Sequence, residues 1–136
     1  MRDLVYPATL QPESHGAFTV RFPDFPEAIT SGRNHADALT EGEDCLQEAI
    51  AGRMVRKEGI PAASRLKRGQ AGVRVAFYLA PKLALYLAMR EKAINNSELA
   101  RRLGVTETIV RRMLNPRHDT KPKNFRRLWS CLGRRF

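Results

Sequence analysis

The residues best suited to a defined chemistry lie between Asn95 and Asn115, and that chemistry is DNA recognition. Polar and charged side chains recur on one side of a helix predicted to begin near Thr106. Arginine can form two hydrogen bonds with guanine, asparagine can do the same with adenine, and threonine can contact the methyl group of thymine. The DNA-binding candidates in this stretch are Thr106, Glu107, Thr108, Arg111, Arg112 and Asn115.

Two short helices joined at Gly104 would present these side chains. Glycine adopts the positive φ that commonly ends a helix, and Asn95, three residues before Glu98, and Thr106 are suited to be N-caps. Apolar residues recur at helical spacing on both sides of the glycine: Leu99, Ala100, Leu103, Val110, Met113 and Leu114. The pattern predicts a helix-turn-helix whose second helix enters the major groove. The alternative is an ordinary helical hairpin with a solvated charged face.

The net charge of +10 is unevenly distributed along the 136 residues. Residues 1–60 contain 6 Lys or Arg and 10 Asp or Glu, whereas residues 61–136 contain 18 basic and 4 acidic residues. The net charges of the two parts are therefore −4 and +14. A strongly basic part is typical of a nucleic-acid binder, and Lys121 and Lys123 are further candidates for phosphate contacts. The acidic part is expected to face a basic protein partner.

The remaining patterns predict an α+β protein with a small sheet-and-helix domain at residues 1–79 and an all-α domain at residues 80–136. Alternating apolar residues predict strands at 4–10, 18–22, 27–32 and 73–79. Helical spacing predicts helices from Asn34, as an N-cap, to about Met54, from 81 to about 92, and at 125–132. Because proline lacks an N–H donor, the first strand should be an edge strand or carry Pro7 on its free side.

Acidic residues form a stripe on the predicted helix that follows Asn34. Steps of three and four residues place them on one face, opposite the apolar face. The stripe consists of Asp37, Glu41, Asp44 and Glu48, and Asp24 and Glu27 precede it in the chain. These six carboxylates are candidates for contacting a basic protein. The alternative interpretation of the stripe is a solvated helix face.

Enzymatic chemistry has little support in the sequence. His15, His35 and His118 have no metal-ligand spacing, no predicted strand carries a carboxylate in its interior, and no nucleophile motif occurs. We therefore expect no catalytic residue, no metal and no cofactor. Cys45 and Cys131 are expected to be buried thiols in a reducing cytosol. With no leader and no apolar run near the roughly 18 residues of a membrane span, the sequence predicts a cytoplasmic protein without membrane contact.

With both parts laid out, the sequence resembles the HicB family of type II toxin–antitoxin antitoxins over nearly its whole length. The most specific motif is Pro-Asp-x-Pro-x-Ala-x-Thr-x-Gly at residues 23–32. Further matches are at residues 6–10, 16–20, 36–39, 82, 85 and 99–104. The resemblance implies a reduced RNase H-like domain that blocks a HicA-like RNA-cleaving toxin, followed by a DNA-binding domain that represses the operon. The catalytic carboxylates of the RNase H fold have no match here.

A single helix-turn-helix buries a modest interface, so we expect a homodimer or higher even oligomer that reads two half-sites of operator DNA. Two alternative functions belong to other classes of protein. One is a stand-alone helix-turn-helix transcription regulator with an oligomerisation or sensing domain at its N-terminus. The other, disfavoured by the missing carboxylate cluster, is a nuclease.

Overall fold

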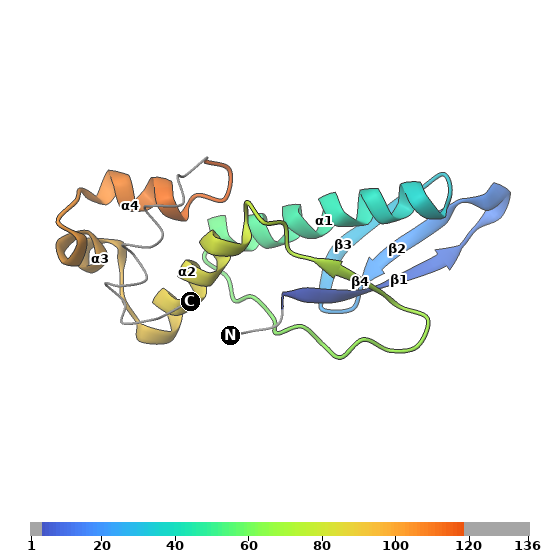
Figure 1. The fold of residues 1–136 in the computed structure, drawn as a ribbon, viewed down its shortest axis with the longest axis horizontal. Coiled ribbons are helices and arrows are strands. Elements are labelled where there is room, and N and C mark those ends of the chain that lie inside the picture. Colours follow the sequence, from blue (N-terminus) through green and yellow to red (C-terminus); the bar gives the residue numbers. More distant parts are fainter. Residues whose placement is uncertain (1–3, 119–136) are drawn as a thin grey trace. The chain divides into compact units, whose positions relative to one another are not determined.

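The computed structural model describes residues 4–118, which form two compact units that meet between Ala76 and Phe77 (Figure 1). The sequence prediction put the boundary three residues later. The first unit contains β1 (Val5–Pro12), a 3-10 turn (Ser14–Gly16), β2 (Phe18–Phe22), β3 (Phe25–Gly32), α1 (His35–Val55) and β4 (Ala71–Arg74). The second contains α2 (Ala80–Lys92), α3 (Asn96–Leu103) and α4 (Glu107–Leu114). Lys121, Lys123, Cys131 and the helix predicted at 125–132 lie outside the described residues.

The sheet of the first unit is antiparallel with strand order β3-β2-β1-β4, so β1 is an interior strand. The prediction of an edge strand is therefore wrong. The alternative, that the strand carries Pro7 on a free side, fits better, because Pro7 lies opposite Gly72 of β4 while β2 pairs only with Thr9 to Pro12. At Pro7, β1 has a strand partner on one side alone, and the missing N–H donor costs the sheet little.

Helix α1 covers one face of this sheet. Its predicted N-cap is confirmed, since Asn34 Oδ1 accepts a hydrogen bond from the backbone N–H of Asp37 at 2.8 Å. Glycine permits close packing at two positions. A Cβ added to Gly32 would lie 2.3 Å from Ala38 N, and one added to Gly42 would lie 3.2 Å from Val20 Cγ1. The side chains buried between helix and sheet include Tyr6, Ala8, Val20, Phe22, Phe25, Ala28, Ala38, Leu46 and Ile50.

Strand β4 is shorter than the predicted strand at 73–79 and ends at Arg74. The cause is its neighbour, because β1 begins at Val5, directly opposite Arg74, and offers no longer edge for pairing. One more backbone hydrogen bond follows the strand, from Val75 N to Leu4 O at 2.8 Å, and the next backbone N–H bonds to a side chain of α1. Gln47 Oε1 accepts from Ala76 N at 2.9 Å, and Gln47 Nε2 donates to Arg74 O at 3.2 Å.

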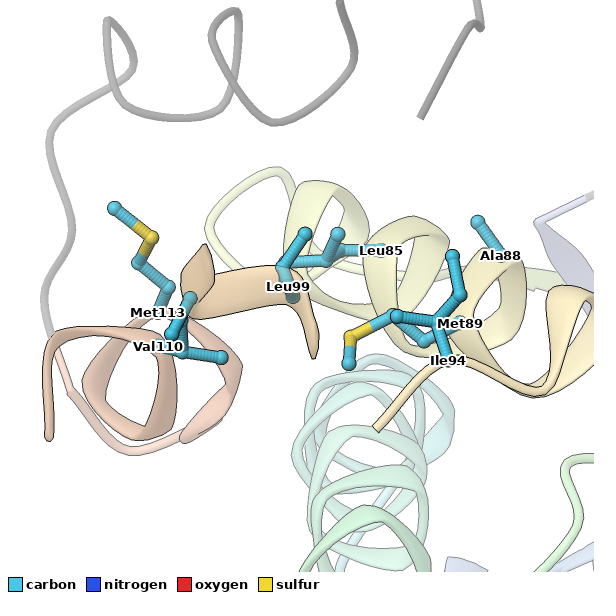
Figure 2. Packing of buried hydrophobic residues seen from close by; sticks show 8 residues of the cluster. Leu85, Ala88, Met89, Ile94, Leu99, Val110 and Met113 are labelled. Carbon is cyan, nitrogen blue, oxygen red and sulfur yellow. The ribbon is translucent and has the colours of Figure 1, made fainter. Parts of the chain in front are cut away.

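The three described helices of the second unit pack around one apolar cluster (Figure 2). The two short helices and the turn predicted at 95–115 are confirmed. Asn95 accepts from Glu98 N at 2.8 Å, Thr106 accepts from Ile109 N at 3.4 Å, and Gly104 ends α3 with φ of 68°. The cluster consists of Leu85, Ala88, Met89, Ile94, Leu99, Ala100, Val110 and Met113.

Within the part of the chain that the structure describes, no helix combines the length and the apolar character required to cross a membrane.

Candidate functional site

The outer face of α4 carries the candidate DNA-reading side chains. Val110 and Met113 are buried in the cluster, so the positions on the opposite side of the helix are exposed. Thr108, Arg111 and Arg112 lie at three- and four-residue steps and therefore project from the same exposed face. Glu107 lies beside them and is 3.7 Å from Arg111. An exposed ion pair of this kind contributes less than about 1 kcal/mol, so Arg111 can leave it to bind another group.

Two of the predicted DNA-binding residues also have structural tasks at the ends of α4. Thr106 uses its hydroxyl as the N-cap. At the other end, Asn115 Oδ1 accepts a hydrogen bond from Arg117 N at 3.0 Å, which turns the chain after the helix. The Asn115 side chain is therefore occupied at its oxygen, although a bidentate contact with adenine requires both oxygen and nitrogen.

A buried lysine, not predicted as a site residue, holds the C-terminal end of α4. Lys82 in the first turn of α2 is only 3% exposed, and its Nζ donates to Arg112 O at 3.2 Å and Met113 O at 3.3 Å. Cations are favourable beside the last carbonyls of a helix, which carry its negative dipole end. The sequence contains a signal for this buried position, because Lys82 precedes Leu85 by three residues and Met89 by seven and so lies on the apolar side of its helix.

On the first unit, the outer face of α1 is acidic. Glu41, Asp44 and Glu48 are exposed and lie at three- and four-residue steps, with Glu43 next to them. The structure thus brings three of the six predicted toxin-binding carboxylates together on one helix face.

The other three carboxylates are held by neighbouring residues. Arg53 donates to both oxygens of Glu27, at 2.6 and 2.8 Å, and its guanidinium lies 4.9 Å from the ring centroid of Phe25. These hydrogen bonds from Arg53 lower the pKa of Glu27 to about 2, against an opposing effect of partial burial. Glu27 therefore ties β3 to the end of α1.

Asp24 and Asp37 are likewise engaged. Asp24 Oδ2 accepts from Ser64 N at 2.8 Å and its other oxygen accepts from the Ser64 hydroxyl. Asp37 accepts from the backbone N–H of Arg33 at 2.9 Å, and this bond, followed by that from the Arg33 side chain, lowers the pKa of the carboxyl. Both residues shape the fold around them, so a binding role would require them to serve two partners.

The charge asymmetry changes when it is counted by structural unit. Residues 61–76 belong to the first unit and bring four cations, so residues 1–76 contain 10 basic and 10 acidic residues. Residues 77–136 contain 14 basic and 4 acidic residues, a net charge of +10. The first unit is therefore neutral overall, and its acidity belongs to the α1 face.

Among residues 4–118, no three His, Cys, Asp or Glu side chains are placed to hold a metal ion. The ring of His35 packs edge-on against Phe18 at 5.3 Å between centroids. Cys45 is half-buried, and burial raises the pKa of its thiol.

Comparison with known proteins gives a consistent result over both units. Residues 5–84 match the family model described as HicB_like antitoxin of bacterial toxin-antitoxin system. The chain is 35% identical to Antitoxin HicB of Escherichia coli (strain K12) over 116 residues, which are 85% of this chain and 84% of that protein. It is 33% identical over 133 residues to Antitoxin HicB 1 of Photorhabdus laumondii subsp. laumondii, covering 98% and 84% of the two chains. Antitoxin HicB of Pseudomonas fluorescens is 28% identical over 125 residues.

Proposed function

Because the chain belongs to the HicB-like antitoxin family of bacterial toxin–antitoxin systems, we propose that its first unit binds and inhibits a HicA-like RNA-cleaving toxin. We further propose that its second unit represses its own operon by binding operator DNA. In this role the protein acts in the cytoplasm as a homodimer or higher even oligomer, without catalysis of its own.

The exposed acidic face of α1 carries the toxin-binding proposal. Glu41 and Asp44 have no hydrogen bond or ion pair from their side chains to any described residue, so they are available to a partner. A protein that cleaves RNA must bind phosphates and therefore exposes cations. Such a surface is electrostatically complementary to the α1 face, which favours fast association and occupies the cations that RNA would need.

Charge reversal tests this assignment. The Glu41→Lys/Asp44→Lys variant should weaken neutralisation of the HicA-like toxin at least about tenfold, because close charge pairs across an interface contribute on the order of 1.5 kcal/mol or more. RNA cleavage by the toxin at increasing antitoxin concentration measures the effect. Glu13→Lys/Glu58→Lys is the control, since it changes net charge equally at exposed residues outside α1. Full neutralisation by the α1 variant would refute the assignment.

The outer face of α4 carries the DNA-binding proposal, and α3 with α4 then forms a helix-turn-helix. Arg111 and Thr108 are exposed opposite the buried side of the helix, and both helices have the caps that fix their ends. The net charge of +10 on residues 77–136 favours association with phosphates. We assign base reading to Arg111, with Thr106, Thr108 and Asn115 beside it, and phosphate binding to Lys121 and Lys123.

Operator binding tests the role of Arg111. Loss of a base-reading arginine should cost about 1 to 3 kcal/mol on the specific duplex and little on a scrambled one. The matched control is Arg101→Ala, which removes an exposed arginine from α3. Equal weakening of both duplexes by Arg111→Ala would show that α4 is not the reading helix. A stand-alone transcription regulator, the alternative function, would bind the operator but protect no RNA from the toxin.

A further inference from the structure

The face of the sheet that α1 leaves uncovered carries cations. Tyr6 and Ala8 of β1 are buried toward α1, and side chains alternate along a strand, so Val5 and Thr9 point to the opposite face. Residues directly opposite each other in paired strands share a face. Arg21 pairs with Thr9, and Arg74 pairs with Val5, so both arginines project from the uncovered face.

The segment between α1 and β4 adds three more cations to this face. It runs on the side of the sheet opposite to α1 (Figure 1). Gln70 ties it down, since its Nε2 donates to Thr9 Oγ1 at 3.4 Å and its Oε1 accepts from Lys67 N at 2.8 Å. Leu66 also packs there, 3.9 Å from the position of a Cβ added at Gly72. The segment therefore carries Arg65, Lys67 and Arg68 on the same side of the sheet as the two strand arginines.

These cations are available to a ligand. All are exposed, and none uses its side chain in a hydrogen bond or ion pair with another described residue. We define the cationic face as Arg21, Arg65, Lys67, Arg68 and Arg74. The neutral first unit therefore carries exposed carboxylates on the outer side of α1 and exposed cations on the other side of the sheet.

We propose that the cationic face binds the phosphate backbone of DNA beside the site recognised by α4. The inference rests on the proposed DNA binding by the second unit and extends it to the first. Cations dominate this face. Among the described residues, Ile29 and Leu66 are its large exposed apolar side chains, so the composition of the face fits a polyanion better than a protein interface.

The chain connection favours DNA among polyanions. Arg74 ends β4 and α2 begins at Ala80, so five residues join the cationic face to the second unit. They span at most about 20 Å when extended. DNA held by α4 is therefore present at high effective concentration near the cationic face, and a weak phosphate contact there adds to the affinity. Because the α1 carboxylates lie on the other side, the toxin and DNA can be bound together.

Two duplexes of different length test the inference on the full chain. One contains only the operator core protected from nuclease, and the other extends the core by about 15 base pairs of unrelated sequence at each end, to add phosphates for the cationic face. Binding is measured by fluorescence anisotropy at several salt concentrations. The variants are Lys67→Gln/Arg68→Gln on the cationic face and Arg33→Gln/Arg56→Gln as the control of equal charge, all at exposed residues.

The expected result is that the natural chain and the control bind the longer duplex at least about tenfold more tightly at low salt. Lys67→Gln/Arg68→Gln should lose this preference, lower the slope of log K against log salt by about one per lost contact, and keep its affinity for the core. Equal binding of the two duplexes by the natural chain overturns the inference but leaves operator binding by α4 intact. Failure to bind the core overturns both. Reduced toxin neutralisation with unchanged DNA binding would assign the face to the toxin and also overturn it.

Discussion

Replacing Lys82 by methionine should damage the second unit in a specific way. Methionine nearly matches the length of lysine but carries no donor, so the carbonyls of Arg112 and Met113 lose the bonds of 3.2 and 3.3 Å that hold them. An unsatisfied buried acceptor costs about 1 to 3 kcal/mol, whereas removing a buried ammonium, 3% exposed here, recovers part of its desolvation free energy. We expect a net loss of about 2 kcal/mol in the free energy of unfolding, well below the sum for two acceptors.

Two measurements check this prediction. Urea unfolding followed by circular dichroism should show a lower midpoint for the second unit and an unchanged one for the first, because the two carbonyls that Lys82 holds belong to α4 of the second unit. Operator binding, measured where the variant is fully folded, should weaken about tenfold for the specific duplex because the end of α4 is no longer fixed. Scrambled DNA should be bound as before, since phosphate contacts need less exact geometry.

Lys92→Met is the matched control, because it makes the same chemical change at an exposed position of α2. It should leave stability within about 0.5 kcal/mol. If Lys82→Met is as stable as the control and retains full discrimination between the two duplexes, the reasoning about the C-terminal end of α4 is refuted.

Three further predictions follow from the first unit. Glu27→Gln should cost about 1 kcal/mol at neutral pH, a value kept small because the Glu27 side chain is 41% exposed to solvent. Since the pKa of Glu27 falls from 4.5 to about 2 on folding, this stability is full above pH 4.5 and is lost as the pH falls toward 2. When the free energy of unfolding is measured against pH, the curves of the natural chain and the variant should therefore converge at about pH 2. Curves that stayed parallel down to this pH would contradict the argument. Gly32→Ala should destabilise the unit by more than about 2 kcal/mol, because the new Cβ would lie 2.3 Å from Ala38 N, and thermal melting against the natural chain measures the loss. A fragment of residues 1–79 should neutralise the toxin in the RNA-cleavage assay without the second unit, and neutralisation by residues 80–136 alone would reverse the assignment.

Features set by neighbouring residues were predictable from the sequence. Asn34, Asn95 and Thr106 act as N-caps through bonds to residues three positions ahead, and Gly104 ends α3 through its own φ. Apolar spacing likewise identified the helices, because one face of each must be buried.

Features set by distant partners were not predictable in the same way. The end of β4 depends on where β1 begins. Arg53 donates a hydrogen bond to Glu27, which lies 26 residues away in the sequence. The bond from Lys82 to Arg112 O spans 30 residues. The cationic face is a further example. Counting charges in residues 1–60 and 61–136 separated the cations of residues 61–76 from the acidic residues with which they fold.

The strand order β3-β2-β1-β4 also determines when each part of the sheet can form. The first three strands and α1 follow one another with short connections, so they can pair as soon as they are synthesised. By contrast, β4 pairs with β1 across 63 residues at Ala8 and Ala71, and even with α1 in place, closing the remaining loop of residues 56–70 costs roughly 2 kcal/mol in chain entropy. β4 should therefore join last and open first, with faster amide hydrogen exchange at Val73 than at Val20 although both side chains are buried.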